Sequence, residues 1–178
     1  MNEEILVKKC IEGDNRAQKK LFDLFAPKLF GVCLRYMKDH DLAQDTLQDG
    51  FVKIFTKLSD YNGKGSFEGW MRRIVVNTCL DQLRKDQKLK MNTSIDDVSF
   101  LVKDNHWIEE ELTAKDLLKL VESLPDGYRV VFNMFAIEGY SHKEIAEQLN
   151  ISENTSKSQF SRAKSHLRKK LIELGIER

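Results

Sequence analysis

The stretch from Ser141 to Lys170 constrains the fold of this chain more than any other segment. Ser141 followed by Glu144 is the sequence pattern of a capping box, which predicts that a helix begins there. Asn150 tolerates the left-handed conformation that ends a helix, and Ser152 is suited to cap the next one. Two amphipathic helices joined by so short a turn predict a helix-turn-helix in an all-α domain.

The second of these predicted helices has two chemically different faces. Its inward face follows helical spacing and comprises Ser156, Phe160, Ala163, Leu167 and Leu171. Outside this face lie polar side chains that can bond phosphates and base edges: Asn154, Lys157, Ser158, Ser161, Arg162 and Ser165. Six Lys or Arg residues against one acidic residue lie between Glu153 and Lys170, which favours DNA binding. Two such helices also occur in helical bundles that bind no DNA, so this alternative stays open.

The chain has 178 residues, ordinary apolar content and only two prolines, which suits an all-α globular protein. Its charge is unevenly distributed: 17 basic and 13 acidic side chains in residues 1–90, 3 and 8 in 91–122, and 9 and 7 in 123–178. Two basic ends around an acidic middle favour two binding modules joined by a linker. We therefore predict an N-terminal helical domain over 1–90, a linker over 91–112 and a C-terminal helical domain over 113–178.

Apolar spacing predicts four helices in the first half of the chain, over residues 3–12, 16–37, 42–58 and 67–88. Pro27 falls inside the second of them and predicts a kink or a break there. In the second half, helices are expected from Thr113 to about Leu124 and from Asp126 to Glu138, ahead of the helix-turn-helix.

The predicted third helix carries a polar cluster opposite its apolar side. Asp45, Gln48 and Asp49 lie there at positions i, i+3 and i+4. Such a cluster is either a solvated acidic face or a docking surface for a basic partner. A catalytic role is not supported, because no histidine, metal-ligand set or second carboxylate cluster accompanies it.

The segment from Tyr61 to Ser66 predicts a flexible, basic, glycine-containing loop. No strand precedes it, so it does not match a nucleotide-binding fingerprint. Phe67 and Trp70 beside a loop and a basic helix face suit single-stranded nucleic acid, but burial in the core is the favoured interpretation for both rings. The side chains that line one side of the following helix are Arg73, Asn77, Asp81 and Arg84.

Three scattered cysteines, Cys10, Cys33 and Cys79, include no CxxC pair and no paired histidine, which argues against a disulfide framework or a zinc site. They are expected to be reduced and to lie in or near the core. The charged N-terminus lacks an apolar signal-peptide segment, and no apolar run approaches the length of a membrane span. These features predict a soluble cytoplasmic protein, and no metal or cofactor is expected.

Short fragments in both halves of the chain, taken in order, form a specific combination. Those of the first half are Ala43 to Asp45, Gln48 to Phe51, Phe67 to Ile74 and Asn77 to Lys85. Those of the second half are Leu124-Pro125, Tyr128 to Phe132, Glu138 to Ser141, Lys143 to Ala146 and Asn154 to Ala163. With an acidic linker between the two sets, nearly the whole chain resembles the sigma-70 family of bacterial transcription initiation factors, in particular its small two-domain extracytoplasmic-function (ECF) group.

This resemblance implies a non-catalytic subunit that binds core RNA polymerase and directs it to promoters. Asp45, Gln48 and Asp49 match the positions that dock on a coiled coil of the polymerase. The loop and the following helix would recognise the promoter −10 element and hold a flipped base, with these candidate contacts: Tyr61, Asn62, Lys64, Ser66, Arg73, Asn77, Asp81 and Arg84. The six polar side chains of the recognition helix would contact the duplex −35 element, and the linker would pass through the polymerase cleft. An anti-sigma protein is an expected partner.

Three positions depart from the common pattern of that family. Gln44 stands where an acidic residue is usual, and Ser156 replaces an apolar residue of the recognition helix. Gly50 sits inside the docking helix, where it costs about 1 kcal/mol in helix propensity relative to alanine. They put the strength of docking and the packing angle of the recognition helix in question. Two alternatives stay open, a stand-alone helix-turn-helix regulator and a helical adaptor that binds only proteins. An enzyme is the least favoured class, because no nucleophile–base pair is visible.

Overall fold

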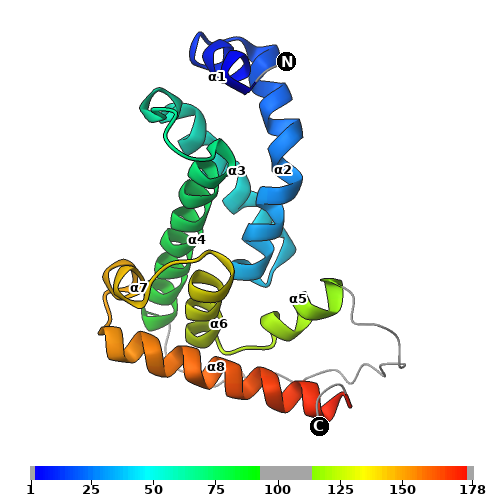
Figure 1. The fold of residues 1–178 in the computed structure, drawn as a ribbon, viewed down its shortest axis with the longest axis vertical. Coiled ribbons are helices and arrows are strands. Elements are labelled where there is room, and N and C mark those ends of the chain that lie inside the picture. Colours follow the sequence, from blue (N-terminus) through cyan, green and yellow to red (C-terminus); the bar gives the residue numbers. More distant parts are fainter. Residues whose placement is uncertain (1–2, 93–113, 176–178) are drawn as a thin grey trace. The chain divides into compact units, whose positions relative to one another are not determined.

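The computed structural model describes residues 3–92 and 114–175 (Figure 1). These residues form eight α-helices, one short 3-10 helix and one π-helical turn, and they contain no strand, so the all-α prediction is confirmed. The chain divides into two compact units, residues 1–96 and 97–178. Nearly all of the predicted linker, 91–112, lies outside the described residues.

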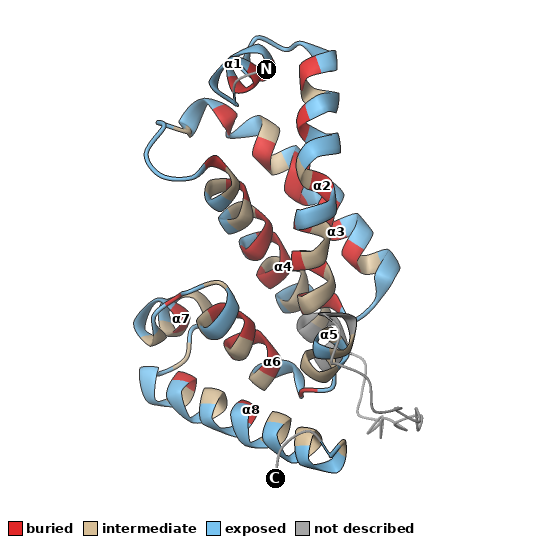
Figure 2. Ribbon diagram, turned by 45° about the vertical axis from the view of Figure 1, so that its right-hand side comes forward, coloured by how far each residue is buried: buried red, intermediate tan, exposed pale blue. Residues whose placement is uncertain are grey.

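The first unit is built on three helices that pack against one another, α2 (Asn15–Met37), α3 (His40–Thr56) and α4 (Phe67–Asn92). A short helix, α1 (Glu3–Ile11), packs on α2 and on the 3-10 turn η1 (Leu58–Asp60). Figure 2 shows the buried residues of α4 as a stripe along one side of the helix. The four helices predicted for this half are confirmed, with ends that differ by a few residues.

Pro27 does not break α2, which is continuous from Asn15 to Met37, so a break at this position is ruled out. A proline removes the N–H group that would bond the carbonyl of the residue four positions earlier, here Asp23. Both Pro27 and Asp23 are exposed, so water can bond that carbonyl. Leu21 and Leu29, on either side, are buried and hold both segments of the helix in place.

Gly50 lies where α3 crosses α4 closely. A Cβ atom at this position would lie 3.1 Å from Cγ2 of Val75 on α4. The glycine therefore allows a close approach of the two helices, although it costs about 1 kcal/mol in helix propensity relative to alanine. Sequence reasoning identified only that cost.

The second unit contains α5 (Ala114–Glu122), α6 (Asp126–Phe132), the π-helical turn η2 (Asn133–Ile137), α7 (His142–Leu149) and α8 (Glu153–Glu173). Helices α6 and α7 both pack on α8 (Figure 1). The helix predicted over 126–138 has the expected extent but ends in the π-helical turn, where the N–H of Glu138 donates to the carbonyl of Asn133 at 2.9 Å. Gly139, with φ of +77°, then ends the segment.

The local signals of the helix-turn-helix are confirmed. Ser141 and Glu144 form both bonds of the capping box, because each side chain accepts a hydrogen bond from the other's backbone N–H. Asn150 has a left-handed backbone, with φ of +53°, and ends α7. The Ser152 hydroxyl accepts a hydrogen bond from the N–H of Thr155 at 2.9 Å and starts α8. The turn between the two helices is therefore fixed by short-range contacts.

Cys10, Cys33 and Cys79 are all buried thiols, as predicted. Burial raises the pKa of the Cys10 thiol, and the negative charge of Asp14 adds to the shift. No helix among the described residues combines the length and the apolar character that crossing a bilayer requires.

Candidate nucleic-acid interface

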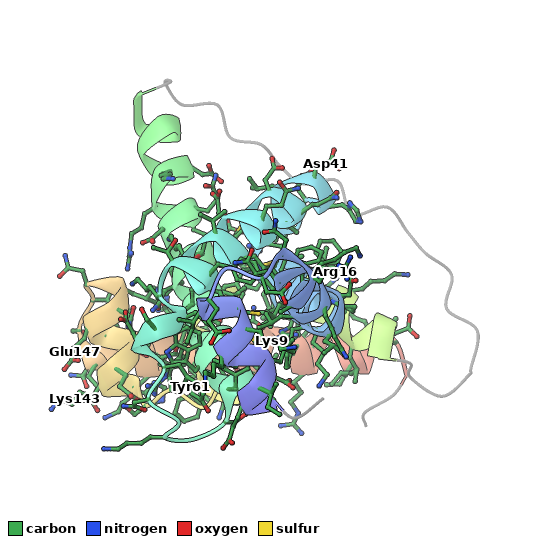
Figure 3. All side chains as sticks on the ribbon, turned by 90° about the horizontal axis from the view of Figure 1, so that it is seen from above. Lys9, Arg16, Asp41, Tyr61, Lys143 and Glu147 are labelled. Carbon is green, nitrogen blue, oxygen red and sulfur yellow. The ribbon has the colours of Figure 1, made fainter. Side chains whose placement is uncertain are left out.

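The exposed side of α3 is acidic. Asp45, Gln48 and Asp49 are all exposed, as their spacing predicts, while residues between them face the core. Sequence reasoning missed two further members of this side, Asp41 and Val52, which continue it by one turn in each direction. The Asp41 side chain is 97% exposed and points away from the unit (Figure 3). We call these five residues the acidic face.

A hollow of about 370 Å³ lies between α2 and α3, and sequence reasoning did not reveal it. Its lining residues are Phe22, Asp23, Ala26, Pro27, Phe30, His40, Gln44 and Leu47. The lining is mostly apolar, and the exposed Gln44 precedes Asp45 of the acidic face directly in the chain. The first unit thus has an apolar depression next to its acidic face.

The predicted loop from Tyr61 to Ser66 leads into α4 (Figure 3) and is folded on itself. The Tyr61 hydroxyl donates a hydrogen bond to the carbonyl of Gly65 at 2.9 Å, and the Asn62 side-chain oxygen accepts one from the N–H of Lys64 at 3.0 Å. Ser66 accepts a hydrogen bond from the N–H of Gly69 at 3.3 Å, at the start of α4. Asn62, Lys64 and Ser66 are exposed, whereas Tyr61 is half-buried.

Aromatic rings pack behind this loop. Phe67 is buried, which confirms its core assignment, whereas Trp70 is only half-buried. The two rings are stacked with centroids 5.8 Å apart, and Phe25 of α2 meets Phe67 edge-on at the same distance. This cluster anchors the loop to the core of the first unit.

The four polar residues predicted along α4 lie on its outer side. Arg73, Asn77 and Arg84 are exposed, and Asp81 is half-buried. Asp81 makes two ion pairs, with Arg84 at 2.9 Å and with Lys53 of α3 at 3.1 Å. Lys53 was missed, because no short-range pattern links two residues on different helices. Exposed ion pairs contribute only about 0–1 kcal/mol, so both cations can exchange Asp81 for a phosphate at little cost.

The outer side of α8 is polar and accessible. All six residues predicted there are exposed: Asn154, Lys157, Ser158, Ser161, Arg162 and Ser165. Lys157 forms an ion pair with Glu153 at 2.7 Å. The hydrogen bond that Lys157 donates to Glu153 lowers the pKa of Glu153, and the positive charge of Lys157 contributes a smaller part of this shift. The structure therefore brings all six together on one face of α8. This face begins at Asn154, next to the N-terminus of the helix.

A hydrogen bond between a buried serine and a half-buried histidine joins α8 to α7. Ser156 is fully buried, and its hydroxyl lies 2.9 Å from Nδ1 of His142, the first residue of α7. The His142 ring is stacked on Phe135 with centroids 4.2 Å apart, and Phe160 of α8 lies 4.6 Å from Phe135. The serine that departs from the apolar pattern therefore has a specific partner.

Arg129 is also buried in the second unit. Its Nη1 donates to the carboxylate of Asp126 at 2.8 Å and more weakly to the carbonyl of Leu124 at 3.4 Å. Burial lowers the pKa of Arg129, while the nearby negative charge of Asp126 opposes the shift. These bonds fix the start of α6 to the connection that precedes it.

Comparison with known families gives two matches, one in each unit. "Sigma-70 region 2" matches residues 21–89, and "Sigma-70, region 4" matches residues 114–167. The ECF RNA polymerase sigma factor SigW of Bacillus subtilis is 27% identical and aligns over 96% of this chain and 100% of its own length. The ECF RNA polymerase sigma-E factor of Haemophilus influenzae is 25% identical and aligns over 96% of both chains.

Two solved structures share the fold. The sigma factor RpoE from Bartonella quintana, solved with the anti-sigma factor NepR, gives a TM-score of 0.56 at 23% identity, over 86% of this chain and 96% of that one. CnrH, solved with the cytosolic domain of CnrY, gives a TM-score of 0.51 at 22% identity, over 94% of this chain and 96% of that one. At such identities the likeness establishes the helical fold alone.

Because both sigma-70 regions match in order, and with relatives that align end to end, the chain belongs to the sigma-70 family, in its ECF group. Its function is that of an RNA polymerase sigma factor in transcription initiation, which the comparisons favour over a stand-alone helix-turn-helix regulator. Sigma factors are initiation factors rather than enzymes.

Proposed function

We propose that this protein is a non-catalytic specificity subunit, acting in the cytoplasm, whose two units bind different targets. The predicted N-terminal domain, residues 1–90 within the first unit, binds core RNA polymerase and the −10 element. The predicted C-terminal domain, residues 113–178 within the second unit, binds the −35 element. The observation that carries the proposal is that the acidic face of α3 and the polar face of α8 are both exposed in a chain that matches both sigma-70 regions.

The acidic face is the proposed docking surface for the polymerase. Asp41, Asp45 and Asp49 give it a negative potential, which attracts a basic partner and orients it. The opposite side of α3 is buried in the first unit and includes Gly50, which packs on α4. A partner docked on α3 therefore lies at a defined place relative to α4, the helix that carries the −10 candidates.

The loop 61–66 and the outer side of α4 are the proposed −10 site. Opening the promoter requires unstacking a base, which costs a few kcal/mol, and contacts to the displaced base offset that cost. Lys64, Arg73 and Arg84 are exposed cations that suit phosphates of an opened strand. Asp81 pairs with Arg84 and Lys53, and a phosphate can take its place in either ion pair at little cost.

The six exposed residues of α8 are the proposed contacts to the −35 duplex. Lys157 and Arg162 suit phosphates or guanine edges, and Asn154 suits an adenine edge near the N-terminus of the helix. Contacts of this kind make binding fall steeply with salt.

An anti-sigma protein is the proposed regulatory partner. The structural relatives RpoE and CnrH were solved in complexes with NepR and with the cytosolic domain of CnrY. The acidic face of α3 and the polar face of α8 are surfaces that such a protein can cover. Covering both would prevent this chain from binding polymerase and DNA.

The test is transcription with core RNA polymerase on templates whose upstream DNA is randomised, followed by sequencing of the templates transcribed. The wild-type chain is expected to select two separated sequence elements. The double substitution Asp45→Lys with Asp49→Lys should weaken polymerase binding by at least about tenfold, by loss and reversal of charge. The matched control, Glu4→Lys with Glu12→Lys, makes the same charge change elsewhere in the first unit.

Two outcomes would contradict the proposal. Absence of any selected element with the wild-type chain would refute promoter recognition. Unchanged polymerase binding by the Asp45 and Asp49 variant, with its helix content intact, would refute the docking surface while leaving promoter recognition in place.

A further inference from the structure

Tyr61 connects the two ends of the loop 61–66. Its hydroxyl donates to the carbonyl of Gly65 at 2.9 Å. Its ring centroid lies 5.0 Å from that of Phe67 and 5.5 Å from that of Trp70. One side chain therefore bonds the far end of the loop and packs on the start of α4 at the same time.

The backbone between these contacts depends on such support. Gly63 and Gly65 have φ of +73° and +82°, in a region that other residues rarely adopt. Glycine loses more conformational entropy than any other residue when it is ordered. The Tyr61 bond and the Asn62–Lys64 turn restrict this segment before DNA arrives, so less entropy remains to be lost on binding.

We propose that Tyr61 is a positioning residue: it pre-organises the loop 61–66 and thereby sets how strongly the protein discriminates between bases at the −10 element. This inference rests on the proposed −10 role of the loop. Because the hydroxyl and the ring of Tyr61 both make contacts within the protein, the groups presented to a flipped base come from its neighbours. Lys64 and Asn62 are the exposed candidates.

Removing the hydroxyl lowers the fraction of molecules whose loop is already in the binding conformation. The affinity for the preferred base falls in proportion to that fraction, whereas the affinity for bases that make no loop contact is unchanged. An intramolecular hydrogen bond corresponds to a roughly two- to tenfold change in such an equilibrium. Because water competes for this exposed bond, we expect the lower part of that range, about two- to fivefold.

Tyr61→Phe in the full-length chain tests the proposal, because it removes only the hydroxyl. With core polymerase on the randomised templates, the preference for one base in the −10 element should fall about two- to fivefold. The −35 preference and the melting temperature should stay unchanged. The matched control is Tyr128→Phe, at a half-buried tyrosine of α6, which should alter neither preference.

Lys64→Ala separates the failure of this inference from the failure of the proposed function. If Lys64→Ala weakens the −10 preference and Tyr61→Phe does not, Tyr61 is not a positioning residue and the −10 role of the loop stands. If neither variant alters the −10 preference, the −10 role of the loop fails, and the inference fails with it. If Tyr61→Phe weakens both promoter preferences equally and lowers the melting temperature, its hydroxyl only stabilises the fold, and the inference is overturned.

Discussion

Buried polar side chains are satisfied differently in the two units. In the first unit, Thr46 and Thr78 each donate to a carbonyl four residues earlier in their own helix, at 2.7 and 2.8 Å. In the second unit, Ser156 bonds His142 on another helix, and Arg129 bonds Asp126 of its own helix and, more weakly, the carbonyl of Leu124 ahead of α6. The buried hydroxyls of Thr46 and Thr78 are therefore bonded within their own helices, whereas the buried hydroxyl of Ser156 is bonded to a different helix.

This difference decides what holds each functional face in position. Apolar contacts are non-directional, so the first unit depends on the fit of side chains between α2, α3 and α4. Hydrogen bonds depend on both distance and angle, so the second unit fixes α8 through defined polar contacts. We expect volume changes to damage the first unit most, and loss of single polar partners to damage the second.

The largest effect is expected at Gly50, where the apolar fit is tightest. Gly50→Leu forces α3 away from α4, because even a Cβ would lie 3.1 Å from Val75. It should lower the free energy of unfolding of the first unit by about 2–3 kcal/mol, as overpacking does. Hydrogen exchange of α3 and α4 amides measures the loss. Gly31→Ala is the control, since its Cβ would meet nothing within 4 Å, and it should stabilise α2 by about 0.5–1 kcal/mol. Similar losses in both variants would contradict the close crossing.

The next effect is expected at the Arg129 and Asp126 pair. Asp126→Asn leaves a buried guanidinium beside a neutral group and should destabilise the second unit by about 1–2 kcal/mol, reduced because Asp126 is itself exposed. Arg129→Met removes the buried charge altogether and should cost less. Hydrogen exchange of α6 compares the two. A larger loss for Arg129→Met would mean that the guanidinium contributes more than its bond to Asp126.

A smaller effect is expected at the His142 and Ser156 pair. A double-mutant cycle of His142→Ala and Ser156→Ala should give a coupling free energy of about 0.5–1.5 kcal/mol. Each substitution should weaken −35 recognition more than −10 recognition. Thr46→Val is the matched control in the first unit. The Thr46 hydroxyl bonds only its own helix, so this substitution should leave −35 recognition unchanged. Zero coupling would show that aromatic packing alone orients α8.

The smallest effect is expected at Glu153, which lies on the exposed side of α8. Its pKa is lowered by the hydrogen bond from Lys157, so the stabilisation is present above the ordinary glutamate pKa of about 4.3 and is lost as pH falls through the lowered value. Lys157→Ala should raise the pKa of Glu153 toward its ordinary range in an NMR titration. An unchanged pKa of Glu153 would show that Lys157 does not form this ion pair in solution.

Much of the fold follows from short-range signals. The capping box at Ser141, the left-handed Asn150 and the cap at Ser152 were all recognisable, because each acts between residues a few positions apart. The exposed sides of α3 and α8 were recognisable for the same reason, since helical spacing assigns faces. The break considered at Pro27 was wrong. Proline disfavours a helix locally, but buried residues on both sides of it stabilise a continuous helix.

The sequence by itself determined the helical segments, their polar and apolar sides and the division of charge along the chain. Tertiary structure alone decided that Gly50 lies close to Val75, that Lys53 pairs with Asp81 and that Ser156 has His142 as its partner. These last two pairs join residues 28 and 14 positions apart. No local pattern encodes such distances, because they exist only once the helices have packed.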